Sequence, residues 1–359
     1  MSHSSLGNIL DARNNSFNAV RLMAALAVFV SHAFLIAPAG GHWEPLDGSA
    51  YNLGQISVNI FFFLSGMMLS RSYALKPNLG QFVVARLLRI FPGLVVCGVV
   101  TAWVIGALNT ALSPVAYFSD VQTLTYPLRI LLQFNNAELP GVFAYGLEPG
   151  EVNVPLWTVK FELLAYGAML FVPLLGLFGS KWFSLVLTVG FGAMLMVSTA
   201  TQVFDTNVIG SIVRFGFSFS LGMSAFLYRD QIKANWVLAI AGIVVTMFSP
   251  PWAGAHVFSI LAFAYLAITI GGTTLPVLTG ATSRNDVSYG LYLYAFPIQQ
   301  ALIAQFGHTI ETSLLFSVLA LLVSMVAAYA SWIFVEKPAL SMKGAFAART
   351  RMAEGSVSG

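Results

Sequence analysis

Apolar segments close to the length of a membrane span recur through this chain and limit what it can fold into. A helix needs about 20 apolar residues to cross the hydrocarbon core of a bilayer. Only 9% of the residues are charged, whereas an average soluble domain has about 25%. We therefore predict an all-α, polytopic transmembrane helical bundle with about ten spans. The predicted segments are 17–37, 53–70, 92–112, 155–178, 182–200, 207–228, 234–250, 254–272, 287–306 and 312–335.

Lysine and arginine gather in alternate loops between these segments. One set of loops carries side chains such as Arg71 and Lys181, whereas the other set, which includes 38–52, has almost none. Because cytoplasmic loops of membrane proteins carry the excess of Lys and Arg, we expect both termini to be cytoplasmic. Residues 1–345 are predicted to form a single integral-membrane domain, followed by a disordered tail at 346–359.

Two connections between predicted spans contain helical patterns of their own. The stretch from Leu79 to Ile90 carries Arg86 and Arg89 on one helical face, and we expect an interfacial basic helix that ends at Pro92. The longest connection, 113–154, is predicted on the outer side. It contains an amphipathic piece, 126–134, followed by an irregular stretch rich in Gly and Pro.

The first apolar segment, FNAVRLMAALAVFVSHAFLIA, contains two ionisable residues. Arg21 and His32 are eleven residues apart, and eleven helical steps of about 100° bring them to nearly the same face, about 16 Å apart along the axis. Ionisable groups at membrane depth are costly and usually functional. We therefore expect this stripe of one membrane helix to belong to the functional site.

The predicted orientation sorts the ionisable residues into two groups by depth. Arg21, Arg86 and Arg89 lie toward the cytoplasmic side, and they are either site residues or ordinary charged anchors at the lipid interface. His32, Glu162 and Arg214 lie at a similar depth nearer the outer side. Two structural alternatives stay open here. Glu162 and Arg214 can form a stabilising ion pair, and His32 can be a core histidine bonded to a neighbouring helix.

The single cysteine, Cys97, excludes an internal disulfide framework and a cysteine-based metal site. No second His or Cys falls at ligand spacing. We therefore expect no metal, and nothing in the sequence indicates a nucleic-acid partner.

Six motifs in order along the chain resemble one known family. The chain is similar to the membrane-bound acyltransferase-3 family, which O-acylates bacterial surface and exported carbohydrates. The spacing of Arg21 and His32 adds to the resemblance. The motifs are FNAVRLMAALAVFVSHA, VNIFFFLSGMML, RLLRIFP, VNVPLWTVKFELLAY, SYGLYLYAFPIQQ and VEKP.

The resemblance implies an acyl-CoA co-substrate, usually acetyl-CoA, taken from the cytoplasm, and transfer of its acyl group to a sugar hydroxyl. It also implies a location in the inner cell membrane. Two departures matter. Asn18 and Ala19 stand where relatives often have an acidic residue and a glycine, and Ala295 stands where many have a histidine.

The resemblance and the two depth groups predict a division of labour. The cytoplasmic arginines would hold the phosphates of coenzyme A, since a guanidinium binds phosphate bidentately. His32 would act as general base or form an acyl-histidine intermediate, with Glu162 beside it. The outer loop, with exposed aromatics such as Phe143 and Tyr145, would cover the acceptor. Further candidates for the oxyanion or substrate are Arg214, Ser65, Asn153 and Trp157, although Ser65 fits a helix-packing role beside Gly66 better.

Two other functions fit the same composition. A transporter or flippase for a polysaccharide or lipid-linked sugar would share the ten spans and the intramembrane charges. Inverted repeats and paired broken helices would favour that function, and the sequence shows neither clearly. A non-catalytic membrane subunit of an envelope assembly would have no need of His32. The expected partners of the enzyme are a carbohydrate acceptor, acyl-CoA and the bilayer. The oligomeric state stays open.

Overall fold

The structure is a computed structural model, and every regular element in its described part is helical. It contains no β-strand there beyond two isolated bridges. The expected tail, 346–359, lies outside the described residues. These are 4–12, 14–36, 44, 46, 48–133, 138–144, 150–203, 208–248, 252–273, 279–280, 282, 285–306 and 310–343.

The chain forms two compact units, and helices α2 and α8 pass from one to the other. The first unit comprises Met1–Ser31, Trp43–Leu75 and Phe161–Asp286, and the second comprises the remaining residues. The helices of the first unit are α1 (Leu6–Asp11), α2 (Phe17–Ile36), α3 (Leu53–Leu75), α8 (Val159–Leu174), α9 (Lys181–Thr201), α10 (Val208–Leu227), α11 (Trp236–Phe248) and α12 (Ala255–Gly271).

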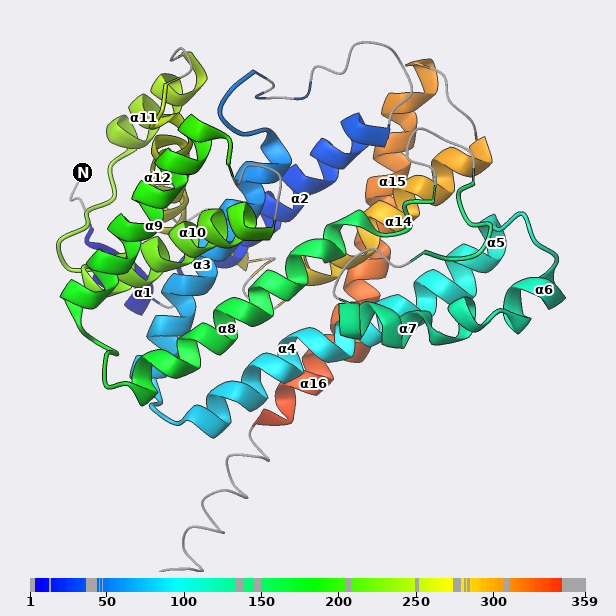
Figure 1. Cartoon of the computed structure of the whole chain (residues 1–359), viewed down its shortest axis with the longest axis horizontal. Coiled ribbons are helices and arrows are strands. Elements are labelled where there is room, and N and C mark those ends of the chain that lie inside the picture. The colour runs from blue at the N-terminus through cyan, green and yellow to red at the C-terminus, as the bar shows by residue number, and fades with distance from the viewer. Residues whose placement is uncertain are drawn as a thin grey trace, which may run out of the picture. The chain divides into compact units, whose positions relative to one another are not determined.

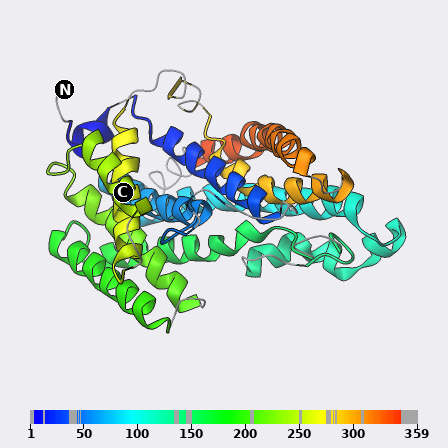
Figure 2. The same ribbon diagram turned by 90° about the horizontal axis from the view of Figure 1, so that it is seen from above.

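The second unit contains three distorted helical turns besides its α-helices. In it, α14 and α15 lie side by side in both ribbon views (Figure 1, Figure 2). Its elements are α4 (Leu79–Val100), the π-helix η1 (Thr101–Gly106), α5 (Ala107–Asn109), α6 (Pro114–Ser119), α7 (Val121–Gln133), the 3-10 helix η2 (Val154–Thr158), α14 (Ser288–Phe306), α15 (Ile310–Ser331), the π-helix η3 (Trp332–Glu336) and α16 (Lys337–Ser341).

Each of the ten apolar segments predicted from the sequence contains a helix in the structure. Within the described ranges, seven helices are long and apolar enough to cross a membrane. The segments 234–250 and 254–272 correspond to the shorter helices α11 and α12, and 287–306 corresponds to α14. The all-helical membrane fold is therefore confirmed, whereas the count of ten spans and the orientation stay predictions.

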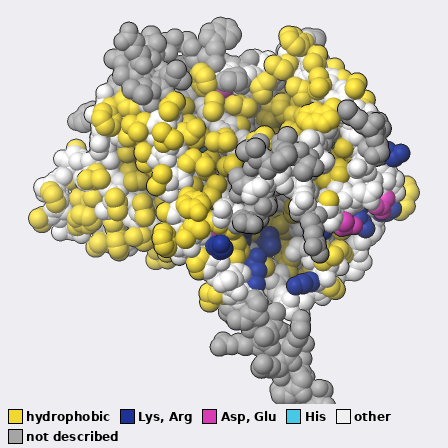
Figure 3. All heavy atoms as spheres, turned by 180° about the vertical axis from the view of Figure 1, so that it is seen from behind, with side chains coloured by type: hydrophobic (Ala, Val, Ile, Leu, Met, Phe, Trp, Pro, Cys, Tyr) yellow, Lys and Arg dark blue, Asp and Glu magenta, His cyan; other side chains and the backbone are white. Residues whose placement is uncertain are grey.

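Exposed apolar side chains cover much of the surface, as contact with lipid requires. Figure 3 shows one such face, on which hydrophobic side chains are abundant and charged ones are few. Among the exposed residues, Trp182 is 77% exposed and Phe171 is 64% exposed. A water-soluble protein rarely exposes apolar patches of this extent.

The predicted end of the basic helix at Pro92 is wrong, whereas its position at the membrane interface stays a prediction. Helix α4 runs without interruption from Leu79 through Pro92 to Val100, and η1 and α5 extend it to Asn109. Proline removes one helical hydrogen bond, and membrane helices tolerate that loss when neighbouring helices support the backbone. Ile90 and Leu94, on either side of Pro92, are both buried, so packing holds the helix together across the proline.

The long connection predicted on the outer side, 113–154, is part of the second unit and packs within it. The expected amphipathic piece is α7, which buries Tyr126 and Ile130. The hydroxyl of Tyr117 donates a hydrogen bond to the carbonyl of Ala102 at 2.7 Å. Phe143 is only 4% exposed, so its predicted role as an exposed aromatic is wrong. Tyr145 lies outside the described residues.

Two glycines bring α3 and α10 of the first unit into backbone contact. A Cβ atom at Gly66 would overlap the backbone of Phe219, and a Cβ atom at Gly222 would overlap the backbone of Phe63. Small residues allow this close approach where membrane helices cross. Gly66 is therefore a packing residue of this crossing, whereas the packing role of its neighbour Ser65 stays a prediction.

We predict that Gly222→Ala destabilises the protein by about 1–3 kcal/mol, because the added methyl group forces α3 and α10 apart. Gly190→Ala on α9 is the matched control, since a Cβ atom there meets nothing within 4 Å. The control should leave stability unchanged or raise it by up to about 1 kcal/mol through helix propensity. Unfolding by SDS in mixed micelles measures both. Equal stability of the two variants would contradict the tight crossing.

Candidate active site

Three cationic side chains gather where η3 and α16 pack against α4 in the second unit. Arg86 and Arg89 lie on one side of α4, and η3 and α16 both contact that helix. Lys343 follows Glu336 by seven residues, or two helical turns, and so lies on the same side of the chain's last helix. This group of Arg86, Arg89 and Lys343 is called the cation cluster below.

A buried carboxylate offsets part of the charge of the cation cluster. Nη1 of Arg89 lies 3.8 Å from Oε2 of Glu336, with Arg89 10% exposed and Glu336 1% exposed. The hydroxyl of Ser331 donates to Oε1 of Glu336 at 3.0 Å. Arg89 also lies over the ring of Tyr289 at 5.6 Å. The cluster therefore keeps two net positive charges if all four groups are ionised.

Lys343 lies close enough to Arg86 and Arg89 for their charges to affect its pKa. Its burial, together with the positive charges of Arg86 and Arg89, lowers the pKa of Lys343 to about 8. Arg86 lies over the ring of Phe82, one turn earlier on α4, at 5.8 Å. An anion bound to the cluster would relieve this repulsion, and phosphate suits guanidinium and ammonium groups.

Arg21 belongs to the first unit and has an acidic partner of its own. Its Nη1 lies 3.2 Å from Oδ2 of Asp286, with the two side chains 32% and 13% exposed. Asn18, one turn earlier on α2, donates to the carbonyl of Thr282 at 3.1 Å. These contacts tie the start of α2 to the segment before α14. The expected grouping of Arg21 with the α4 arginines joins residues of both units and stays a prediction.

His32 lies near the end of α2, in the part of that helix that belongs to the second unit. Its ring meets the ring of Phe296 of α14 edge-on, with centroids 5.2 Å apart. Its Nδ1 atom is buried and has no hydrogen-bond partner among the described residues. A buried nitrogen without a partner is costly. The expected hydrogen bond of a core histidine is therefore missing at this atom.

Glu162 and Arg214 are the chain neighbours of two aromatic residues that meet in the first unit. The rings of their chain neighbours, Phe161 and Phe215, meet with centroids 5.3 Å apart. The hydroxyl of Tyr166, one turn along α8, donates to the carboxylate of Glu162. The guanidinium of Arg214 lies 4.5 Å from the ring centre of Phe215. The grouping of this pair with His32 joins both units and stays a prediction.

The remaining candidates differ in what surrounds them. Asn153 is fully buried and donates to the carbonyl of Leu293 at 3.0 Å, which ties the segment before η2 to α14. Trp157 lies in η2 and is partly buried. Ser65 is partly buried on α3 beside the α10 crossing. Asn153 and Ser65 therefore lie at contacts between elements of the fold. Substrate roles for Asn153, Trp157 and Ser65 stay predictions.

Cys97 is buried near the same part of α14. Its thiol donates to the carbonyl of Leu293 at 3.4 Å and accepts from the amide of Asn153 at 3.7 Å. Across the described ranges, no three His, Cys, Asp or Glu side chains gather in a way that could hold a metal ion.

A comparison with protein families decides the identity of the chain. A family model described as an acyltransferase domain matches residues 14–333, which is most of the chain. The chain belongs to the acyltransferase-3 family. The resemblance seen in its motifs is thereby confirmed.

Two relatives of this acyltransferase-3 protein match over nearly their whole lengths. It is 27% identical to an O-acetyl transferase of Shigella phage Sf6, over 90% of this chain and 96% of the relative. It is 28% identical to Nodulation protein 10 of Rhizobium leguminosarum bv. viciae, over 93% of this chain and 95% of the relative. No solved structure matches the chain. The acyltransferase-3 protein is therefore a multi-pass membrane O-acyltransferase.

Three charged residues of this acyltransferase-3 protein were missed from its sequence. Asp286 and Glu336 each hold a predicted site arginine, and Lys343 completes the cation cluster. Glu336 had a usable signal, because it is an acidic residue at the end of an apolar span. Lys343 looked like an ordinary loop cation, and no local pattern singled out Asp286. In the motif SYGLYLYAFPIQQ, Phe296, beside Ala295, provides the ring that contacts His32.

We predict that Arg89→Ala destabilises the protein by about 3 kcal/mol or more, because it leaves the buried carboxylate of Glu336 without its cation. Arg89→Ala combined with Glu336→Ala should recover part of that loss. The free energies of unfolding, measured by SDS titration for both single variants and the double variant, give the coupling. Simple additivity of the two single effects would show that the pair contributes nothing.

Proposed function

We propose that this protein transfers an acetyl group from acetyl-CoA to a hydroxyl group of a carbohydrate, with His32 as the general base. The name of the phage relative, an O-acetyl transferase, supports both the acetyl group and the oxygen acceptor. The carbohydrate class and the coenzyme A donor follow from the family resemblance. The proposed location is the inner cell membrane, with both termini and the donor on the cytoplasmic side.

The observation that carries this proposal is the buried Nδ1 atom of His32, which has no hydrogen-bond partner among the described residues. A nitrogen held in this way can take a proton from a substrate hydroxyl, since no protein group there competes for it. The edge-on ring of Phe296 restricts the orientation of the imidazole. General-base catalysis of this kind contributes about 10²–10⁴-fold to a rate.

The donor would bind at the cation cluster. Coenzyme A carries several phosphate charges, and two net positive charges remain at Arg86, Arg89 and Lys343 after Glu336 is counted. Arg89, whose guanidinium lies 3.8 Å from Glu336, and Arg86 are both proposed to bind phosphates of coenzyme A. Arg21, held by Asp286, is also proposed to contact a phosphate of the donor, as the family resemblance implies.

The proposed reaction balances without an oxidant, a reductant or a metal. The acceptor oxygen attacks the thioester carbonyl carbon while Nδ1 of His32 takes the hydroxyl proton. The carbon–sulfur bond then breaks, and the imidazolium returns the proton to the coenzyme A thiolate. The products are an acetyl ester and free coenzyme A. Glu162 and Arg214 are proposed to bind the acceptor or to stabilise charge on the carbonyl oxygen.

We predict that His32→Ala lowers acetyl transfer by about 100-fold or more while leaving the affinity for coenzyme A unchanged, because only the general base is lost. Purified protein in detergent, labelled acetyl-CoA and a set of candidate glycans provide the assay. Transfer that survives the substitution would remove His32 from catalysis. If wild-type protein labels no glycan but moves sugar across liposome membranes, the function is transport.

We predict that the affinity for coenzyme A falls as pH rises from about 7 to about 9, because Lys343 then loses its charge. The pKa of Lys343 is lowered to about 8, so its cation is present below that pH and is lost above it. Lys343→Arg should keep a permanent charge and flatten the pH profile. Isothermal titration with coenzyme A tests both proteins. A profile unchanged by Lys343→Arg would remove Lys343 from the donor site.

A further inference from the structure

An elongated apolar cavity lies in the first unit between α8, α9 and α10. Its volume is about 140 Å³, and its walls extend from Phe161 to Val172 on α8 and from Ile212 to Met223 on α10. Eleven residues of α-helix rise by about 16 Å, so the cavity is a groove that follows the helix axes. A cavity of about 150 Å³ in another protein holds one benzene molecule. This groove therefore has room for part of one hydrocarbon chain.

The groove offers a ligand almost no hydrogen bond. Of the described residues that line it, only Ser220 has a polar side chain. That hydroxyl already donates to the backbone carbonyl of Phe217 at 3.1 Å. Polar molecules would lose their hydrogen bonds to water on entering such a groove, so the ligand is a hydrocarbon.

The groove opens on the side of α8 that faces away from the core. Leu164 lines it and is 52% exposed, and Ala168, one turn further along, is exposed as well. Because α8 is part of a helix long and apolar enough to span a membrane, this open side would face lipid. A ligand therefore enters from the bilayer and not from water.

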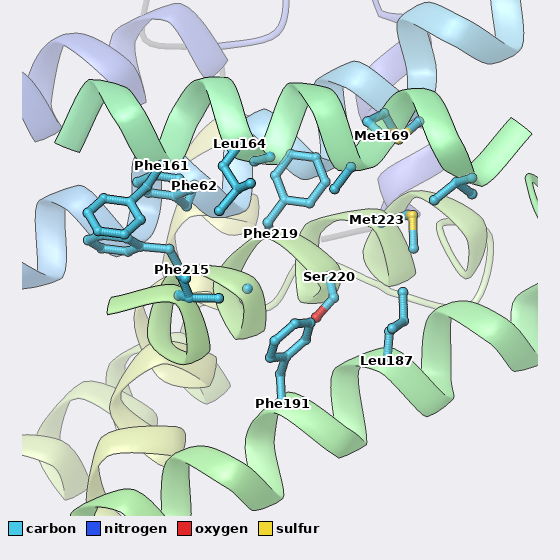
Figure 4. A pocket seen from close by; sticks show the side chains of 15 residues that line it. Phe62, Phe161, Leu164, Met169, Leu187, Phe191, Phe215, Phe219, Ser220 and Met223 are labelled. Carbon is cyan, nitrogen blue, oxygen red and sulfur yellow. The ribbon is translucent and has the colours of Figure 1, made fainter. Parts of the chain in front are cut away.

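One end of the groove lies beside the candidate acceptor residues. Figure 4 shows Phe161, Phe62 and Phe215 together at this end. The ring of Phe215 stacks on Phe62 with centroids 4.2 Å apart, and the guanidinium of Arg214 lies over Phe215. Glu162 directly follows Phe161 in the chain. A hydrocarbon chain in the groove would place its polar head next to Glu162 and Arg214.

We infer that this groove binds the hydrocarbon tail of a lipid-linked carbohydrate acceptor, and this inference rests on the proposed acyl transfer. The tail fixes the acceptor in the bilayer plane, while its sugar head lies at the polar residues that follow the aromatic end. The specificity of the enzyme then has two parts, since the lipid is recognised separately from the sugar.

Photolabelling tests the inference without any catalysis. The probe is an alkyl glycoside with a diazirine in its chain, added to the full-length protein in phospholipid nanodiscs. We expect labelled peptides from 161–172 and 212–223. Ala165→Phe places a ring inside the groove and should lower this labelling about tenfold, as a loss of roughly 1.4 kcal/mol would. Leu164→Trp, at the open side, is the second blocking variant. Ala193→Phe, exposed on α9 and outside the groove, is the matched control.

A transfer assay with the same proteins separates this inference from the proposed function. Ala165→Phe should raise KM for the alkyl glycoside about tenfold and leave KM for the same sugar without a chain unchanged. Equal labelling of the blocked variants and the control variant would overturn the proposal that the groove binds the hydrocarbon tail. An equal rise in KM for both acceptors would do so as well. Groove labelling without acetyl transfer by wild-type protein would instead overturn the proposed reaction and support the lipid site.

Discussion

The free-energy cost of burying charge constrains how the ionisable side chains of this protein find partners. Arg21 is held by Asp286, Arg89 by Glu336, and Glu162 by Tyr166. A membrane helix that carries an ionisable group must remove that group from water, and each of these contacts lowers the free-energy cost of doing so. Nδ1 of His32 differs from these three groups, because it has no hydrogen-bond partner among the described residues. The proposed role of His32 as general base depends on this lack of a partner.

The two groups of charges depend on different kinds of packing. In the first unit, Gly66 and Gly222 let α3 and α10 meet at backbone distance, which also fixes the position of Phe62 against Phe215. In the second unit, η3 and α16 pack on α4, which brings Glu336 to Arg89. The aromatic end of the groove and the cation cluster are therefore consequences of helix contacts, and neither depends on a long loop.

The sequence predicted the helices well, because apolar length is a local signal. It predicted less well what depends on partners far along the chain. Proline appeared to end a helix at Pro92, yet buried neighbours on both sides hold α4 together. Phe143 looked exposed in a loop but is buried. The roles of Asp286 and Lys343 appear only once distant segments are brought together, which no local pattern encodes.

The π-helical turn η3 has a consequence for how this family can vary. A π-turn contains one residue more than the α-turn it replaces, and η3 ends at Glu336, the residue that faces Arg89. Because the turn absorbs the extra residue, deleting one residue within Trp332–Glu336 would restore an α-turn and leave Lys343 on nearly the same face. Only residues inside the turn, Glu336 among them, would change their position against Arg89. A length change of one residue here would therefore alter the carboxylate of the cation cluster while keeping its three cations in place.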